Sequence, residues 1–151
     1  MTTQQFEAVI SKSGSKVLVK LPFDPNAVWG EKTAHYITGS VNGCTVRGAL
    51  GVDEQGHFLP LGPAWRRDNS LDVGSQVTVT LSPEGPQVDA LAADIAEPLR
   101  ADPQARAFFE GLATFYRSNF IKWIEGAKRA ETRAARIAEM ITLLQAGKRE
   151  K

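Results

Sequence analysis

The sequence contains one cysteine, two histidines and two methionines among 151 residues. A single cysteine, Cys44, excludes any disulfide within the chain. The two histidines, His35 and His57, are 22 residues apart, and neither a cysteine pair nor a His-x-x-x-His motif accompanies them. Because a metal site needs three or four converging ligands, we predict no metal site. We also expect no cofactor.

The sequence also lacks long apolar runs. No stretch approaches the roughly 18 to 20 consecutive apolar residues that span a bilayer. The N-terminal run MTTQQFEAVISKSG has no positively charged start followed by an apolar core, so it does not have the pattern of a secretory signal. We therefore expect a cytoplasmic protein with no membrane span.

The motifs of common catalytic sites are missing as well. The serine-rich run at residues 11–15 lacks the G-x-S-x-G pattern of a nucleophile elbow. It also lacks the glycine-rich pattern of a phosphate-binding loop. We predict no catalytic residues, and the sequence leaves open whether any reaction is catalysed.

The charge is unevenly distributed along the chain. Residues 117–151 contain nine Lys and Arg against four Asp and Glu, a net charge of +5, whereas residues 1–116 contain nine against 13, a net charge of −4. Such a division is typical of a basic segment that binds an anionic partner. It is equally typical of two parts of one chain that attract each other. The four acids interspersed in the basic part favour the second interpretation.

The first two thirds of the chain have the pattern of short β-strands. In residues 76–81, Val77, Val79 and Leu81 alternate with polar residues, so the three apolar side chains share one face of a strand. The Asn42-Gly43 pair indicates a hairpin, because both positions of the turn need positive φ. Further strands are predicted at residues 6–10, 16–21, 36–41, 44–50 and 57–61.

A helical pattern begins after about residue 89. Asp102 followed by Pro103 is typical of a helix start. Gly147 is typical of a helix end. Two further helices are predicted over residues 115–128 and 131–145, and residues 91–99 are predicted to form a short helix or linker that ends at Pro98.

These patterns predict an α+β protein built from two regions. Several short strands at regular spacing favour a small antiparallel β-barrel over residues 1–90. A helical appendage of about three helices follows over residues 91–151, and its apolar faces are expected to be buried.

The helical region resembles the bacterial YdeI/OmpD-associated family, also called the bacteriocin-protection family. The family pattern is an aromatic-rich helix with W-I-x-x-A-K, a short break, T-R-x-x-R-I, and a helix that ends near G-K. The matching pairs are Trp123-Ile124, Ala127-Lys128, Thr132-Arg133, Arg136-Ile137 and Gly147-Lys148. The resemblance implies an association with resistance to antimicrobial peptides and with envelope stress, and it supplies no catalytic residues.

The strand region resembles the β-barrel domain of unknown function 1905, which often precedes that helical region. The matching pieces are Leu21-Pro22, the hairpin at 41–43, Arg47-Gly48, Gly56-His57 followed by Leu59 and Leu61, and Gly74. Two positions differ from the family pattern. Gly74-Ser75 replaces the usual Gly-Asp, and residues 82–85 replace an acidic position after the strand. The resemblance implies a closed or split barrel with helices packed at its end.

The first candidate site consists of Trp65, Arg66 and Arg67. These residues follow Gly62-Pro63 and are predicted to lie in a loop. Aromatic and arginine side chains in exposed loops are enriched at binding surfaces, so we predict that the three residues bind a ligand. The alternative is that Trp65 caps the barrel mouth.

The second candidate site consists of Arg129, Arg133 and Arg136. Together with Lys122, these residues fall within roughly 60° of one another if the helix is continuous, because each residue advances about 100°. Guanidinium groups in a row can hold phosphate or carboxylate groups, so we predict that the three arginines bind an anion. The alternative is a solvated face with intrahelical ion pairs, and a break near Ala130 favours that alternative.

We predict a non-catalytic binding or stress-protection protein linked to bacteriocin resistance, as the resemblance implies. Its partner is an unidentified ligand or protein. A nucleic-acid-binding module that uses the basic helices is one alternative. A small-molecule enzyme with a pocket in the barrel, in which His35 or His57 faces a carboxylate, is another. The sequence leaves the oligomeric state open.

Overall fold

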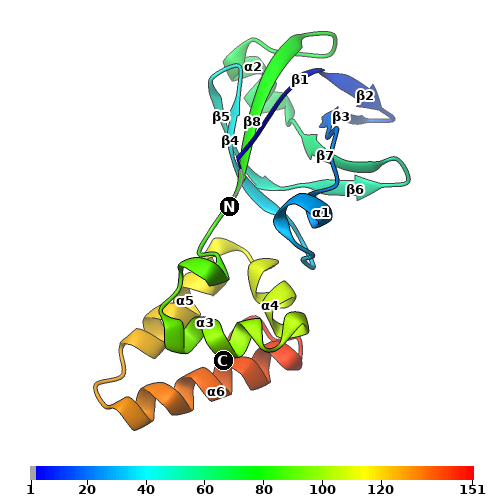
Figure 1. Cartoon of the computed structure of the whole chain (residues 1–151). Coiled ribbons are helices and arrows are strands. Elements are labelled where there is room, and N and C mark those ends of the chain that lie inside the picture. The colour runs from blue at the N-terminus through cyan, green and yellow to red at the C-terminus, as the bar shows by residue number, and fades with distance from the viewer. Residues whose placement is uncertain (1–2) are drawn as a thin grey trace. The chain divides into compact units, whose positions relative to one another are not determined.

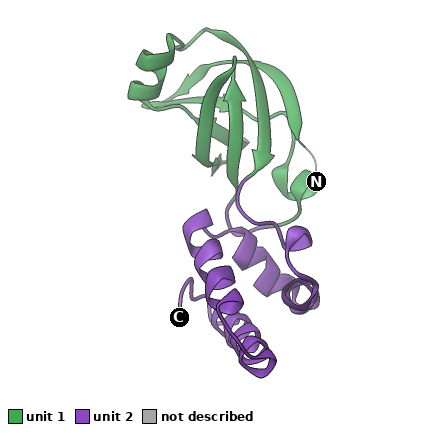
Figure 2. Cartoon of the chain, turned by 90° about the vertical axis from the view of Figure 1, so that its left-hand side faces the viewer, with its two compact units in different colours: residues 1–31, 35–83 green, residues 32–34, 84–151 purple. Residues whose placement is uncertain are grey.

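The computed structural model describes residues 3–151 (Figure 1). The chain folds as two compact units, which Figure 2 shows in different colours. The strand unit comprises residues up to 31 and residues 35–83, and the helical unit comprises residues 32–34 and 84–151. The predicted α+β class is confirmed.

The strand unit contains two four-stranded antiparallel sheets. The first sheet has the strand order β1-β8-β4-β5 and the second has the order β2-β3-β7-β6. The strands of the first sheet are β1 (Gln4–Val9), β4 (Tyr36–Val41), β5 (Cys44–Ala49) and β8 (Gln76–Pro83). The strands of the second sheet are β2 (Ser11–Ser13), β3 (Lys16–Lys20), β6 (Gly51–Asp53) and β7 (Gly56–Pro60).

Both sheets contribute to one apolar core. Val77, Val79 and Leu81 of β8 are buried, as their alternation predicts, and they share the core with Val19 of β3 and Leu59 of β7. The sheets are also linked at their edges. Strand β1 passes into β2 through the single residue Ile10, and β5 passes into β6 through Leu50. The two edge strands of the first sheet therefore continue as the two edge strands of the second.

The predicted Asn42-Gly43 hairpin is confirmed. Both residues have positive φ, 50° and 80° respectively, and Val41 pairs with Cys44 across the turn. The Asn42 side chain also contacts β8, where its Oδ1 accepts the Thr78 N–H at 2.7 Å and its Nδ2 donates to the Gln76 carbonyl at 3.2 Å. The turn thereby fixes the register of three neighbouring strands.

The strand unit also contains two short helices, α1 (Pro25–Trp29) and α2 (Pro63–Asn69). The second corrects the prediction of a loop at Trp65, Arg66 and Arg67, because all three lie on α2. Pro63 occupies the first turn, where its fixed φ and missing N–H suit a helix start. The helix then ends at Ser70, which adopts the left-handed conformation with φ of 57°.

The helical unit has four α-helices and one short 3-10 helix, where about three helices were predicted. They are η1 (Val88–Ala90), α3 (Ala93–Arg100), α4 (Pro103–Glu110), α5 (Thr114–Glu125) and α6 (Ala130–Gln145). The predicted end of the 91–99 element at Pro98 is wrong, because α3 continues to Arg100. The burial of Ile95, Ala96 and Leu99 holds the turn in place although Pro98 removes one backbone hydrogen bond.

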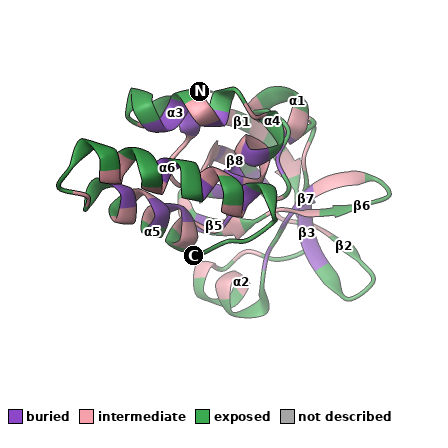
Figure 3. Ribbon diagram, turned by 90° about the horizontal axis from the view of Figure 1, so that it is seen from below, coloured by how far each residue is buried: buried purple, intermediate pink, exposed green. Residues whose placement is uncertain are grey.

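The helices pack through their apolar faces, and Figure 3 shows the buried stripes along α5 and α6. Asp102 caps α4 as predicted, and its carboxylate accepts the Ala105 N–H at 3.1 Å. Gly147 ends α6 with φ of 73°, and Lys148 N–H donates to the Leu143 carbonyl. On these helices Phe120, Ile124 and Met140 are almost completely buried.

The close approach of β4 to β8 gives a test of the strand register. A Cβ atom on Gly39 would lie 1.8 Å from the carbonyl oxygen of Thr80. We expect Gly39→Ala to lower the free energy of unfolding by more than about 2 kcal/mol, because the backbone must move to relieve the clash. Urea denaturation followed by circular dichroism measures the change.

Gly62→Ala is the matched control. Gly62 has φ of −71° and no atom within 4 Å of an added Cβ. Its substitution should change stability by no more than about 0.5 kcal/mol. Equal unfolding midpoints for the two variants would show that β4 and β8 do not pair in this register.

Candidate functional site

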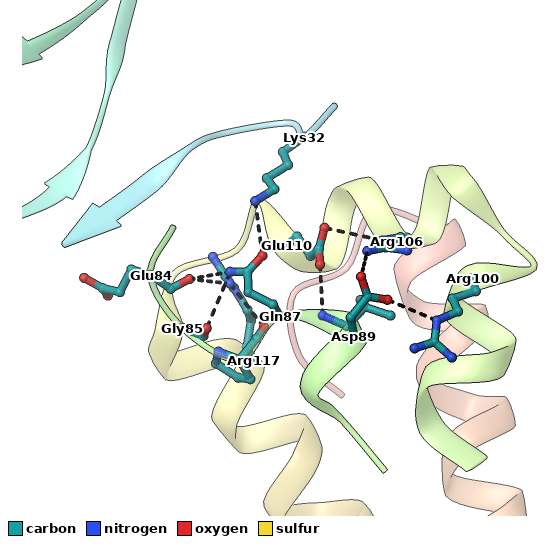
Figure 4. A network of polar contacts seen from close by, with 11 residues as sticks. Lys32, Glu84, Gly85, Gln87, Asp89, Arg100, Arg106, Glu110 and Arg117 are labelled. Carbon is teal, nitrogen blue, oxygen red and sulfur yellow. Dashed lines mark hydrogen bonds and ion pairs between the residues drawn. The ribbon is translucent and has the colours of Figure 1, made fainter. Parts of the chain in front are cut away.

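Three charged side chains are buried within the helical unit. Arg117 of α5 is fully buried, Glu110 at the end of α4 is 4% exposed, and Lys32 is 8% exposed. Figure 4 shows that they converge on residues 84–90, the segment that follows β8. Because burial of an unpaired charge is very unfavourable, their partners define the arrangement.

Arg117 holds the first part of this segment through backbone carbonyls. Its Nη1 donates to the carbonyls of Glu84 at 2.7 Å and Pro86 at 3.3 Å. Its Nε donates to the carbonyl of Leu112 at 2.8 Å, just before α5 begins. The turn fits closely around the guanidinium, since a Cβ on Gly85 would lie 2.9 Å from Nη1. Arg117 therefore connects the start of α5 to the segment before η1.

Glu110 and Lys32 hold the next residues. Glu110 Oε2 accepts the Val88 N–H at 2.9 Å. Lys32 Nζ donates to Gln87 Oε1 at 3.2 Å, and Thr33 N–H donates to the Ala107 carbonyl at 3.4 Å. Burial lowers the pKa of Lys32, while the nearby Glu110 carboxylate acts in the opposite direction. These contacts attach residues 32–34 to the helical unit.

Asp89 completes the network at its exposed side. Arg100 Nε donates to one of its carboxylate oxygens at 3.1 Å, and Arg106 Nη2 donates to the other at 3.2 Å. The hydrogen bond from Arg100, followed by the charge of Arg106, lowers the pKa of Asp89. Side chains from α3, α4 and α5 thus fix residues 84–90 along their length.

The sequence analysis missed this network, although a signal for Arg117 was present. Arg117 precedes Phe120 by three positions and Ile124 by seven, so all three lie on the buried face of one helix. A charged residue on an apolar face indicates a specific partner inside the fold. Two of its three partners are distant in sequence, since Glu84 and Pro86 are 33 and 31 positions away.

The structure separates the three residues of the first predicted site. Trp65 donates its indole N–H to the Thr45 carbonyl at 2.8 Å and packs against the strand core, beside a hollow of about 290 Å³. Arg66 and Arg67 line a different hollow of about 450 Å³. Arg66 binds Asp72 at 2.8 Å, whereas the Arg67 side chain is 76% exposed and lies 3.4 Å from Asp68.

The structure also divides the three arginines of the second predicted site. Arg129 is the exposed N-cap residue of α6. Arg133 forms a two-pronged ion pair with Asp94 of α3, with an Nη2–Oδ1 distance of 2.9 Å. Arg136 donates to the Trp123 carbonyl on α5 at 2.6 Å, and its guanidinium lies over the Trp123 ring. The predicted break in the helix is present between α5 and α6.

The two histidines meet in the strand unit. Their ring centroids are 5.5 Å apart in an edge-to-face arrangement, and His35 Nε2 lies 2.6 Å from Asn26 Oδ1. His57 and Asp24 line a hollow of about 500 Å³, in which Asp24 also caps α1 by accepting the Asn26 N–H at 3.0 Å. Across residues 3–151, no group of three or more His, Cys, Asp and Glu is placed to hold a metal ion.

An aromatic groove runs along α5 of the helical unit. We define it by Tyr116, Asn119, Phe120 and Trp123, which line a hollow of about 430 Å³ together with residues 149–151. Next to it, Phe115 is 66% exposed and its ring meets that of Tyr116 edge to face at 5.3 Å. Within residues 3–151 no helix is long and apolar enough to cross a membrane.

The buried network gives a stability prediction. We expect Arg117→Met to lower the free energy of unfolding by about 3 kcal/mol, because three carbonyls lose a charged donor inside the fold. The control is Lys122→Met, which removes an exposed cation from the same helix and should change stability by less than about 0.5 kcal/mol. Urea denaturation followed at 222 nm compares them, and similar midpoints would contradict a structural role for Arg117.

The ion pair between Arg133 and Asp94 gives a pH prediction. The hydrogen bond from Arg133 lowers the pKa of Asp94 below its ordinary value. Its stabilising contribution is therefore present above the unfolded pKa of about 3.9 and is lost as pH falls through the lower folded pKa. We expect Arg133→Met to reduce Tm at neutral pH, and the difference from the wild type to shrink below about pH 4. Arg129→Met should show no such pH dependence, and a constant difference for Arg133→Met would contradict the pairing.

The family comparisons agree with this two-part structure. No curated protein matches the sequence. Residues 6–81, about half of the chain, match the domain of unknown function 1905. Residues 90–147 match the family described as bacteriocin-protection, YdeI or OmpD-associated. The chain therefore belongs to the family of the domain of unknown function 1905, and its helical region is similar to the bacteriocin-protection, YdeI or OmpD-associated family.

Proposed function

We propose that this protein is a non-catalytic binding protein of the cytoplasm that contributes to resistance against bacteriocins and other antimicrobial peptides. The observation that carries the proposal is the open aromatic surface of α5, in which Phe115 is 66% exposed beside Tyr116. This surface lies inside residues 90–147, the segment that matches the bacteriocin-protection family.

Burial of an exposed aromatic side chain against a partner is favourable, because it removes a large apolar area from water. Aromatic residues are enriched in the centres of binding surfaces because they bury a large area and lose few rotamers. Phe115 is the most exposed aromatic ring among the large apolar side chains of the described residues. Its neighbour Tyr116 is half-buried, so the surface continues from an exposed ring into the groove.

The buried network supports this role because it holds the aromatic surface rigid. Arg117 follows Phe115 and Tyr116 directly, and its guanidinium is held by three backbone carbonyls. The backbone that carries both rings is therefore fixed before any partner binds. A preorganised surface loses less conformational entropy on binding than a flexible one.

The two predicted sites fit this proposal as secondary contacts. Arg67 of the strand unit and Arg129 of the helical unit are each exposed and can bind a carboxylate or phosphate. Arg66, Arg133 and Arg136 each have an intramolecular partner that binding would have to replace.

We propose that the strand unit is a small antiparallel β-barrel that acts as a scaffold. The shared core and the two direct connections between the sheets, at Ile10 and Leu50, support this proposal. A small-molecule enzyme is the second candidate function, because His57 and Asp24 line one hollow of this unit. The variant His57→Ala distinguishes the two functions. If the aromatic surface of α5 is responsible for resistance, this variant should leave resistance unchanged.

A growth experiment tests the proposal. A bacterial strain that lacks the gene is challenged with a cationic antimicrobial peptide and complemented with the wild type or with Phe115→Ser. We expect the wild type to restore growth and Phe115→Ser to leave growth near that of the deletion strain, because the variant removes the exposed ring.

Val52→Ser is the matched control. Val52 is also 66% exposed but lies on β6 of the strand unit, so its substitution should preserve resistance. Equal amounts of folded protein are checked by immunoblotting and circular dichroism. Failure of the wild type to restore growth would overturn the proposed function, and full activity of Phe115→Ser would overturn the role of this surface.

A further inference from the structure

Three cationic side chains of the same chain lie over rings of the aromatic groove on α5, namely Arg136 on α6 and two residues that follow that helix. The guanidinium carbon of Arg149 lies 4.9 Å from the centroid of the Tyr116 ring. Lys151 Nζ lies 5.2 Å from the Trp123 ring. Both distances are within the roughly 6 Å over which a cation is attracted to the face of an aromatic ring. The groove therefore already contacts side chains of one chemical class.

The spacing of the two pairs matches an extended segment. Tyr116 and Trp123 are seven positions apart on α5, so they lie on the same side of the helix about 10 Å apart. Arg149 and Lys151 are separated by one residue, and in an extended chain such residues project to the same side about 7 Å apart. The long arginine and lysine side chains span the remaining difference.

Arg149 and Lys151 contact the groove through these two rings. Residues 149–151 are all exposed. Among the described residues, the last backbone hydrogen bond after α6 is the one from Lys148 N–H to the Leu143 carbonyl. A segment without backbone pairing can leave a groove at little cost.

We infer that the groove of Tyr116, Asn119, Phe120 and Trp123 is a binding site for extended peptide segments that carry Arg or Lys at alternate positions. Residues 149–151 occupy the same place within the chain and compete with such a partner. This inference rests on the proposed binding function and names the chemistry of its ligand.

Residues 117–151 have a net charge of +5, which repels a cationic peptide. Short-range contacts between the cations and the aromatic rings must therefore outweigh this repulsion. Long-range electrostatics opposes the approach of a cationic peptide, and salt screens that opposition. Binding through ring contacts should therefore persist or strengthen as ionic strength rises. Binding of nucleic acid by the basic helices would weaken steeply instead.

The test uses the full chain labelled with ¹⁵N and the probe acetyl-Gly-Arg-Gln-Lys-Gly-amide. The indole N–H signal of Trp123 is followed during titration by NMR. We expect the double variant Arg149→Gln/Lys151→Gln to bind the probe about tenfold more tightly than the wild type, because the internal competitor is removed. The indole signals of Trp29 and Trp65 in the strand unit should not move.

Two further comparisons define specificity. Acetyl-Gly-Gln-Gln-Gln-Gly-amide, which lacks the cations, should leave the Trp123 signal in place. Tyr116→Leu in the double variant should weaken binding of the cationic probe by about tenfold, since one of two ring contacts is lost. An unchanged circular dichroism spectrum establishes that the Tyr116→Leu variant is folded.

Several results would overturn the inference. Equal affinity of the wild type and the double variant would show that residues 149–151 do not compete for the site. Unchanged affinity of Tyr116→Leu, equal binding of the uncharged probe, or no shift of Trp123 at any probe concentration would each exclude the groove as a site for cationic peptides. The proposed function is tested separately by the growth experiment. If resistance depends on Phe115 there, the proposed function holds, and the surface binds a different ligand.

Discussion

The helical unit depends on the buried guanidinium of Arg117. Its donors have a fixed planar arrangement, so the carbonyls of Leu112, Glu84 and Pro86 must take defined positions around it. A lysine has no such planar set of donors, and an apolar residue would remove a charged donor from all three carbonyls, of which that of Glu84 would keep the Gln87 amide at 2.9 Å. Glu110 continues the same arrangement by accepting the N–H of Val88. Arg117 therefore holds the segment between β8 and η1, and Glu110 holds the first residue of η1.

This rigidity extends to the aromatic groove on α5. The turn that carries Phe115 and Tyr116 also carries Arg117, whose side chain is fully buried while Phe115 is largely exposed. Further along the helix, Arg136 binds the carbonyl of Trp123. Both ends of the aromatic groove are thus attached to fixed backbone. The groove is shaped by interactions that a partner would not disturb, which is the condition for a preorganised binding surface.

Local periodicity explains which features the sequence predicts. The alternation around Val79 and the Asn42-Gly43 turn led to the correct strands because each depends on neighbouring residues alone. The Gly62-Pro63 pair is ambiguous, since proline is common both in loops and in the first turn of a helix, and the prediction of a loop at Trp65 was wrong. The buried network could not be predicted because two of the three partners of Arg117 come from a distant segment. The pairing of Arg149 with an aromatic ring also depends on the return of the chain along α5 after α6.

The excess positive charge of residues 117–151 is explained by three different uses of the cations. Arg133 pairs with Asp94, an acid from the preceding part of the chain, which supports attraction between the two parts within the helical unit. Arg136 binds a backbone carbonyl, and Lys151 lies over an aromatic ring. A phosphate that bound Arg133 would have to displace the Asp94 carboxylate, so the gain from the new contact would be reduced by the loss of the existing one. Net charge alone therefore overstates the affinity of these helices for anions, whereas ring contacts with cations are already formed in the folded chain.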